Sequence, residues 1–240
     1  MSPDSRWERD PCTVSQGEAQ AQAGAAVLEP LGRPGSPALQ SPPAGPAALA
    51  GPTVRRLCLL GGESSGKTTL AQALARELHA PCVAEYGREL WLRLGGTFDE
   101  ARLLEVAREQ VRREEEALEQ ARLAARRRAS AGAWVVCDTS ALTTLVYSLL
   151  DHGGAGAELG ALARRPYDLT VLCALDFGFV QDGARRDAGF SARQQALTVK
   201  LLREFGMPWV AASGDVAQRM NAVRAALAQV RHSEPGSGRP

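Results

Sequence analysis

A glycine-rich segment of eight residues restricts the possible folds of this chain more than anything else in its sequence. It matches the pattern G-x-x-x-x-G-K-[ST] and reads Gly61-Gly62-Glu63-Ser64-Ser65-Gly66-Lys67-Thr68. Residues 54–60 before it predict a β-strand, and residues 67–78 after it have the apolar spacing of an α-helix. A strand, a glycine-rich turn and a helix in this order form the βα unit of a phosphate-binding loop.

Each residue type in this segment has a physical role in holding phosphate groups. Gly61 and Gly66 let the backbone curl so that successive N–H groups point at the phosphates, and the following helix adds the positive end of its dipole. We expect Lys67 to reach the β- and γ-phosphates of ATP, and Thr68 to bind Mg²⁺ through its hydroxyl. The predicted nucleotide-binding residues are Gly61, Gly62, Glu63, Ser64, Ser65, Gly66, Lys67, Thr68 and Thr69.

Apolar runs alternate with helical patterns along the rest of the chain. Four further strands are expected, at residues 81–84, 133–137, 169–175 and 208–212. Runs this apolar suit strands that are covered on both faces. The predicted fold class is therefore α/β: a P-loop NTPase fold with a mostly parallel central sheet of five or so strands, helices on both faces and a helical lid. Residues 98–128, rich in Arg, Glu, Ala and Leu, predict a long helix, either broken or continuous.

Composition divides the chain into three segments. Residues 1–52 hold nine of the fourteen prolines together with runs of Ala, Gly and Ser, and are expected to form a disordered extension. Residues 53–230 are expected to form the P-loop domain, and residues 231–240 a flexible tail.

Charge and hydropathy exclude several classes of partner. The 28 basic and 27 acidic residues give a net charge of +1, so no overall field draws the chain to nucleic acid or to an anionic membrane. No apolar stretch approaches the length of a membrane span. The five cysteines include no Cys-x-x-Cys pair and are interpreted as small core residues in a reducing compartment. The sequence therefore predicts a cytoplasmic protein with neither nucleic-acid nor membrane partners, and it predicts no oligomeric state.

Two carboxylates at the ends of expected strands are the candidate chemical groups. Asp138 ends the run 133–137 and is expected on the Mg²⁺ side of the site. Glu85 follows the run 81–84 and is the candidate base that orients or deprotonates an acceptor hydroxyl, although the sequence leaves open whether Glu85 or Asp138 takes that role. The predicted substrate contacts are Glu85, Tyr86 and Arg88.

Each carboxylate also has a purely structural interpretation. Glu85 and Arg88 would form an ordinary ion pair at the start of a helix. Asp138, followed by Thr139 and Ser140, would form a helix cap.

A further cluster follows the fourth expected strand and reads Asp182-Gly183-Ala184-Arg185-Arg186-Asp187. It is interpreted as a lid whose arginine closes over the γ-phosphate and stabilises charge in the transition state. A surface loop with weak Arg–Asp pairs is the alternative.

Taken in order, four clusters resemble the ribosylnicotinamide kinase domain of bacterial NAD-biosynthesis regulator proteins, which are P-loop AAA-type ATPases and kinases. The clusters are residues 60–70, Glu85-Tyr86-Gly87-Arg88, Asp138-Thr139 and Asp182-Gly183-Ala184-Arg185, and the resemblance covers residues 54 to about 230. It implies a kinase that uses ATP and Mg²⁺ to phosphorylate the 5′-hydroxyl of nicotinamide riboside. Larger members of this family carry further N-terminal domains, for which residues 1–52 are too short and too rich in proline, so a stand-alone kinase is expected. The resemblance also implies the catalytic residues Lys67, Glu85, Asp138 and Arg185, because the family's Asp-Gly-x-Arg pattern selects Arg185 over Arg186.

The position before Glu85 departs from this family. An aromatic residue that helps hold the nicotinamide ring often stands there, whereas this chain has Ala84, so Tyr86 or Trp91 would have to substitute. Two alternatives therefore remain: a kinase of another nucleoside or small metabolite, and an ATP-binding regulatory switch with slow hydrolysis. A kinase requires an acceptor-facing carboxylate and a closing lid, whereas a switch requires a positioned water and a partner surface.

Overall fold

The computed structural model describes residues 52–130, 132–176, 178 and 185–232. The expected extension, apart from Pro52, and most of the expected tail lie outside these residues, as do Asp182, Gly183 and Ala184 of the lid cluster. Within the described part, the strands are β1 (Thr53–Leu60), β2 (Cys82–Val83), β3 (Gly132–Asp138), β4 (Leu169–Cys173) and β5 (Val210–Ala212). The helices are α1 (Lys67–Leu78), α2 (Tyr86–Leu94), α3 (Glu100–Arg127), α4 (Ala141–His152), α5 (Ala157–Ala163), α6 (Ala188–Glu204) and α7 (Val216–His232).

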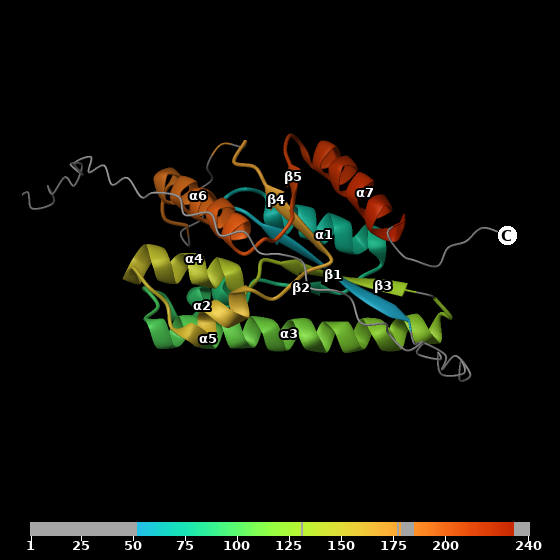
Figure 1. Cartoon of the computed structure of the whole chain (residues 1–240), viewed down its shortest axis with the longest axis horizontal. Helices are drawn as coiled ribbons and strands as arrows, with labels where there is room; N and C mark the ends of the chain where they lie inside the picture. The colour runs from blue at the N-terminus through green and yellow to red at the C-terminus, as the bar shows by residue number, and fades with distance from the viewer. Residues whose placement is uncertain (1–51, 131, 177, 179–184, 233–240) are drawn as a thin grey trace, which may run out of the picture. The chain divides into compact units, whose positions relative to one another are not determined.

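The five strands form one sheet in the order β2-β3-β1-β4-β5, and every neighbouring pair is parallel. Helices α1 and α7 cover one face, while α3, α4, α5 and α6 lie on the other (Figure 1). The predicted α/β fold with helices on both faces is confirmed.

Alternating side chains of the central strand explain why both faces are covered. Leu57 and Leu59 point into the core beneath α1 and α7, whereas Cys58 and Leu60 point into the core beneath α4 and α6. All four are buried, as expected of a parallel strand with helices on both sides. The described residues contain no helix that is both long enough and apolar enough to span a membrane.

The two helices whose bounds the sequence predicts, at residues 67–78 and 98–128, are close to α1 and α3, but three strands are shorter than predicted. α1 has the predicted bounds, and α3 is one continuous helix whose start is capped by Asp99, which accepts a hydrogen bond from the N–H of Arg102 at 2.8 Å. β2 has only two residues. Pro81, which precedes it, has no N–H to donate, although its carbonyl oxygen accepts from the N–H of Val136 at 3.0 Å.

Candidate active site

The glycine-rich loop joins the central strand β1 to α1, and two of its glycines have conformations that other residues rarely adopt. Gly61 has φ 144°, and a Cβ there would lie 2.8 Å from the carbonyl oxygen of Cys173. Gly66 has φ 78° and is the N-cap of α1. These two glycines therefore make the curl of the loop possible, as the sequence predicts.

Lys67 is buried at the start of α1, and its ammonium group turns back into the loop. The Nζ atom donates hydrogen bonds to the carbonyl oxygens of Gly61 at 3.0 Å and Gly62 at 2.9 Å. The positive charge is thus held inside the loop, where a phosphate would be bound.

A cavity of about 400 Å³ lies beside the loop. It is lined by the loop residues 63–69, by side chains of α2, α3 and α4, and by the segment before α6. The predicted site residues that line it are Glu63, Ser64, Ser65, Gly66, Lys67, Thr68, Thr69, Glu85, Arg88 and Arg185. Four predicted site residues are not part of the lining that the described residues form: Gly61, Gly62, Tyr86 and Asp138.

Glu85 stands at the point where the chain leaves β2 and enters α2. It is the N-cap residue of α2, but its side chain accepts no capping hydrogen bond within the described structure, so its carboxylate belongs to the cavity. Burial raises the pKa of Glu85, and the charges of Asp138 and Glu63 add to this effect while those of Lys67 and Arg88 oppose it. A carboxylate with a raised pKa beside a phosphate loop is suited to accept a proton.

Asp138 is the last residue of β3 and is aligned with Leu59 of β1. Burial raises its pKa, whereas hydrogen bonding with Thr68 and the charges of Lys67 and Arg88 lower it. Its Oδ1 atom is buried and has no hydrogen-bond partner among the described residues. A carboxylate oxygen that accepts no hydrogen bond from the described residues, beside a threonine hydroxyl, fits the oxygen ligands that Mg²⁺ prefers.

The capping role considered for Asp138 belongs to Ser140, two residues further along the chain. Ser140 is the N-cap of α4, and its hydroxyl oxygen accepts from the N–H of Leu142 at 3.2 Å. Thr139, between them, has φ 85°, which is rare for a β-branched residue and marks a constrained backbone at the edge of the cavity.

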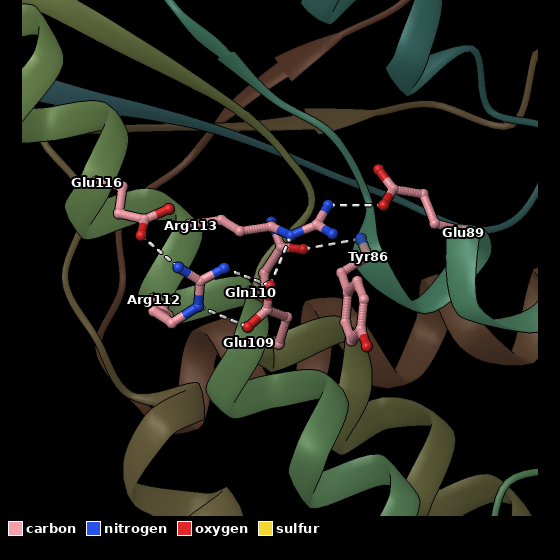
Figure 2. A network of polar contacts seen from close by, with 7 residues as sticks. All are labelled: Tyr86, Glu89, Glu109, Gln110, Arg112, Arg113 and Glu116. Atoms are coloured by element: carbon pink, nitrogen blue, oxygen red, sulfur yellow. Dashed lines mark hydrogen bonds and ion pairs between the residues drawn. The ribbon is translucent and has the colours of Figure 1, made fainter.

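Tyr86, predicted as a substrate contact, packs between α2 and α3. The guanidinium carbon of Arg113 lies 4.5 Å from the centre of the Tyr86 ring. The backbone N–H of Tyr86 donates to Oε1 of Gln110 at 3.0 Å (Figure 2). Arg113 in turn donates to Glu89 at 2.7 Å and to Glu109 at 3.0 Å. The direct substrate contact of Tyr86 stays a prediction, whereas Trp91, five residues further along α2, lines the cavity.

The two lid arginines differ in their surroundings. Nη1 of Arg185 lies 3.4 Å from Oγ of Ser64 in the phosphate loop. The guanidinium of Arg186 forms an ion pair with Asp151 and lies 4.1 Å from the centre of the Phe190 ring. The guanidinium of Arg185 therefore lies beside the loop, while that of Arg186 is engaged with α4 and α6. Both arginines line the cavity, and the backbone N–H of Arg186 donates to Oε2 of Glu63 at 2.8 Å.

Helix α6 holds the loop through contacts that the sequence analysis missed. The N–H of Gly62 donates to Gln195 at 2.8 Å, the N–H of Glu63 donates to Gln194 at 2.7 Å, and the hydroxyl of Ser191 donates to the carbonyl of Glu63 at 2.6 Å. A Cβ at Gly62 would lie 2.5 Å from the carbonyl oxygen of Ser191. Gly62 is thus required by the close approach of α6, which no local sequence pattern reveals.

A second contact missed from sequence comes from α7. Arg219 is buried and donates to the carbonyl oxygens of Ser65 at 2.6 Å, Gly214 at 2.8 Å and Ala174 at 3.1 Å. It also pairs with Asp176. This arginine joins the loops after β4 and β5 to the phosphate loop and so supports the loop's conformation.

A parallel sheet of this strand order, with a phosphate loop between its central strand and the first helix, defines a P-loop protein of the α/β class. The sequence profile of a family described as an AAA domain matches residues 56–219. The chain belongs to that family.

Solved structures with the same fold include two of the NadR protein. One, in complex with NR, matches with a TM-score of 0.59 and 20% sequence identity. The match covers 78% of this chain and 54% of the NadR chain. The other, in complex with NAD and AMP-PNP, has a TM-score of 0.58 and 18% identity, covering 78% and 52%. The chain thus spans about half the length of these proteins. Thymidylate kinase from Ehrlichia chaffeensis has a TM-score of 0.52 and 16% identity, covering 73% and 100%. At these identities the likeness concerns the fold.

Proposed function

We propose that this protein is an ATP-dependent nucleoside kinase that phosphorylates the 5′-hydroxyl of nicotinamide riboside. The observation that carries the proposal is that a single cavity is lined both by the phosphate loop with Lys67 and by Glu85, whose pKa is raised by burial. A phosphate-binding group and a proton acceptor at one cavity are the two components that transfer of a phosphoryl group to a hydroxyl requires.

Different residues around the loop have different roles in the proposed reaction. Lys67 and the loop N–H groups bind the phosphates of ATP, and Thr68 and Asp138 hold Mg²⁺. When bound, Mg²⁺ neutralises charge that develops on the phosphate oxygens. Glu85 accepts the proton of the 5′-hydroxyl as the new O–P bond forms and the bond between the γ-phosphorus and the bridging oxygen of ADP breaks. Arg185, beside Ser64, stabilises the charge of the transferring group.

The apolar part of the cavity lining supports a nucleoside as the substrate. Trp91, Phe98, Leu103 and Val106 line the cavity, and such an apolar and aromatic wall suits a planar base. Ala84 is exposed and is not part of this lining among the described residues, so the aromatic side chain nearest in sequence that faces the cavity is Trp91. The shared fold with the NadR protein that was crystallised with NR favours nicotinamide riboside among nucleosides. A cytoplasmic location remains a prediction of the sequence.

The proposal is tested by measuring ADP release with Mg-ATP and a panel of nucleosides, with products identified by mass spectrometry. The expected result is acceptor-dependent ADP release with formation of nicotinamide mononucleotide, and loss of both in Lys67→Ala although that variant remains folded. ATP turnover that needs no nucleoside would instead indicate the regulatory switch. Turnover with a different nucleoside would support kinase activity but show that nicotinamide riboside is not the substrate.

A further inference from the structure

Gln110 is a buried polar side chain that lines the cavity and is only partly hydrogen-bonded. It lies on α3 with 1% of its surface exposed. Its Oε1 accepts from the N–H of Tyr86 at 3.0 Å (Figure 2). Its Nε2 has no hydrogen-bond partner among the described residues. Buried donors are nearly always paired in folded proteins, so an unpaired one that lines a cavity points to a ligand.

The orientation of this amide is fixed by helix α2. Tyr86 is the first residue of that helix, and its N–H is one of those that the helix itself cannot satisfy. The side chain of Glu85, the N-cap residue, makes no capping hydrogen bond in the described structure, so Gln110 supplies the acceptor. Only an oxygen can accept, and Oε1 therefore faces Tyr86 while Nε2 presents its protons elsewhere.

The neighbours of Gln110 indicate what kind of atom would accept from Nε2. Val106 and Leu103 lie four and seven residues earlier on α3, on the same helix face, and both line the cavity together with Trp91. The donor therefore stands in an apolar and aromatic wall, which suits a flat heterocycle. A charged group would lose its hydration against such a wall, so a neutral acceptor such as a carbonyl oxygen fits best.

We infer that Gln110 determines substrate specificity by donating a hydrogen bond from Nε2 to a carbonyl oxygen on the base of the acceptor nucleoside. This inference rests on the proposed function. It assigns two tasks to one amide: Oε1 caps α2 and leaves Glu85 available to the cavity, while Nε2 recognises the base.

Three ribosides separate recognition from general activity. Nicotinamide riboside carries a carboxamide, the riboside of 3-acetylpyridine keeps only the carbonyl, and the riboside of pyridine has neither. In the wild-type protein, kcat/KM is expected to be similar for the first two and roughly ten-fold or more lower for the third, because that substrate leaves Nε2 unpaired. In Gln110→Met this penalty is expected to vanish, with the three values within about two-fold of one another.

Two further variants distinguish recognition from support of the fold. Gln110→Glu keeps an oxygen for the N–H of Tyr86 but replaces the donor by an acceptor, so it is expected to disfavour the acetylpyridine riboside relative to the pyridine riboside. Gln194→Met changes another glutamine of the cavity, on α6, and is expected to lower activity on all three substrates alike. Equal losses on every riboside in the Gln110 variants would mean that Gln110 only caps α2, and would overturn the inference. Absence of turnover of every riboside by the wild-type protein would overturn the proposed function instead.

Discussion

At the scale of single residues, the chemistry of this site depends on which polar groups are already engaged. Gln110 accepts the N–H at the start of α2, so Glu85 is left to face the cavity. Ser140 caps α4, so Asp138 keeps a buried oxygen without a partner among the described residues. In both cases a nearby polar side chain takes the structural task and leaves a carboxylate available for chemistry.

Replacement of Glu85 tests its role as the base. Glu85→Gln keeps the size of the side chain but cannot accept a proton, and kcat/KM is expected to fall roughly 10²- to 10⁴-fold. In the wild-type protein, activity is expected to rise with pH as Glu85 loses its proton, with a midpoint above the ordinary carboxyl value because burial raises its pKa. A pH profile of kcat/KM between pH 5 and 9 checks both expectations. Survival of the same midpoint in Glu85→Gln, and its loss in Asp138→Asn, would transfer the role of the base to Asp138.

At the scale of elements, the segment before α6 offers a matched pair of arginines. Arg185 lies beside Ser64, whereas Arg186 pairs with Asp151 and packs on Phe190. Arg185→Ala is expected to lower kcat roughly 10²- to 10³-fold with little change in the Kd of ATP, since its charge acts on the transition state. Arg186→Ala is expected to have a much smaller effect on kcat. Titration of ATP and steady-state kinetics check this. Equal losses in kcat and in ATP affinity for Arg185→Ala would contradict a role of Arg185 in stabilising the transition state.

The packing of α6 on the phosphate loop gives a second prediction at this scale. Gly62→Ala places a methyl group 2.5 Å from the backbone oxygen of Ser191, so helix and loop must separate. We expect a loss of about 1–3 kcal/mol in the free energy of unfolding and a roughly 10²-fold loss in kcat/KM from displacement of the loop. Gly154→Ala is the control, because a Cβ there meets nothing within 4 Å. Urea unfolding and kinetics of both variants test it, and a Gly62→Ala protein as stable and active as the control would contradict the packing argument.

The same elements show what could be predicted from sequence. The start of α1 follows from Gly66 and Lys67, because the glycine-rich turn and the helix dipole are local features. The place of Gly62 in the loop also follows from the local motif. The contacts of Gln194 and Gln195 with the loop join positions 131 and 133 residues apart, and no periodicity or motif records such pairs. Gln110 was missed for a similar reason: its partner Tyr86 lies on another helix, 24 residues away.

At the scale of the whole molecule, the parallel sheet brings distant segments to one edge. The phosphate loop follows β1, Glu85 follows β2, and Asp138 ends β3, so the carboxyl ends of three strands supply the candidate chemistry. The strand order β2-β3-β1 thus brings residues that are far apart in the sequence to the same edge of the sheet. Other open α/β sheets bind ligands at this edge.

Helix α3 holds, one turn beyond Gln110, a buried carboxylate that the proposed reaction does not use. Glu114 on α3 is fully buried, and the hydroxyl of Tyr167, just before β4, lies 2.9 Å from both of its oxygens. Burial raises the pKa of Glu114 to about 7, against the hydrogen bond from Tyr167 and the charges of Arg56 and Arg165. The long helix is thereby joined to the segment before β4 through a group whose pKa is near neutral pH.

This group makes the stability of the whole domain depend on pH. Because its pKa is raised on folding, Glu114 stabilises the folded state fully below its unfolded pKa near 4.5, and this contribution is lost as pH rises through about 7. The free energy of unfolding is therefore expected to fall by up to ~3 kcal/mol from this group between pH 5 and 8. Glu114→Gln keeps a hydrogen-bonding side chain without the charge, and is expected to flatten that dependence and to raise stability at pH 8. Urea unfolding of both proteins across this range measures the difference, and parallel pH profiles would show that Glu114 does not change its protonation on folding.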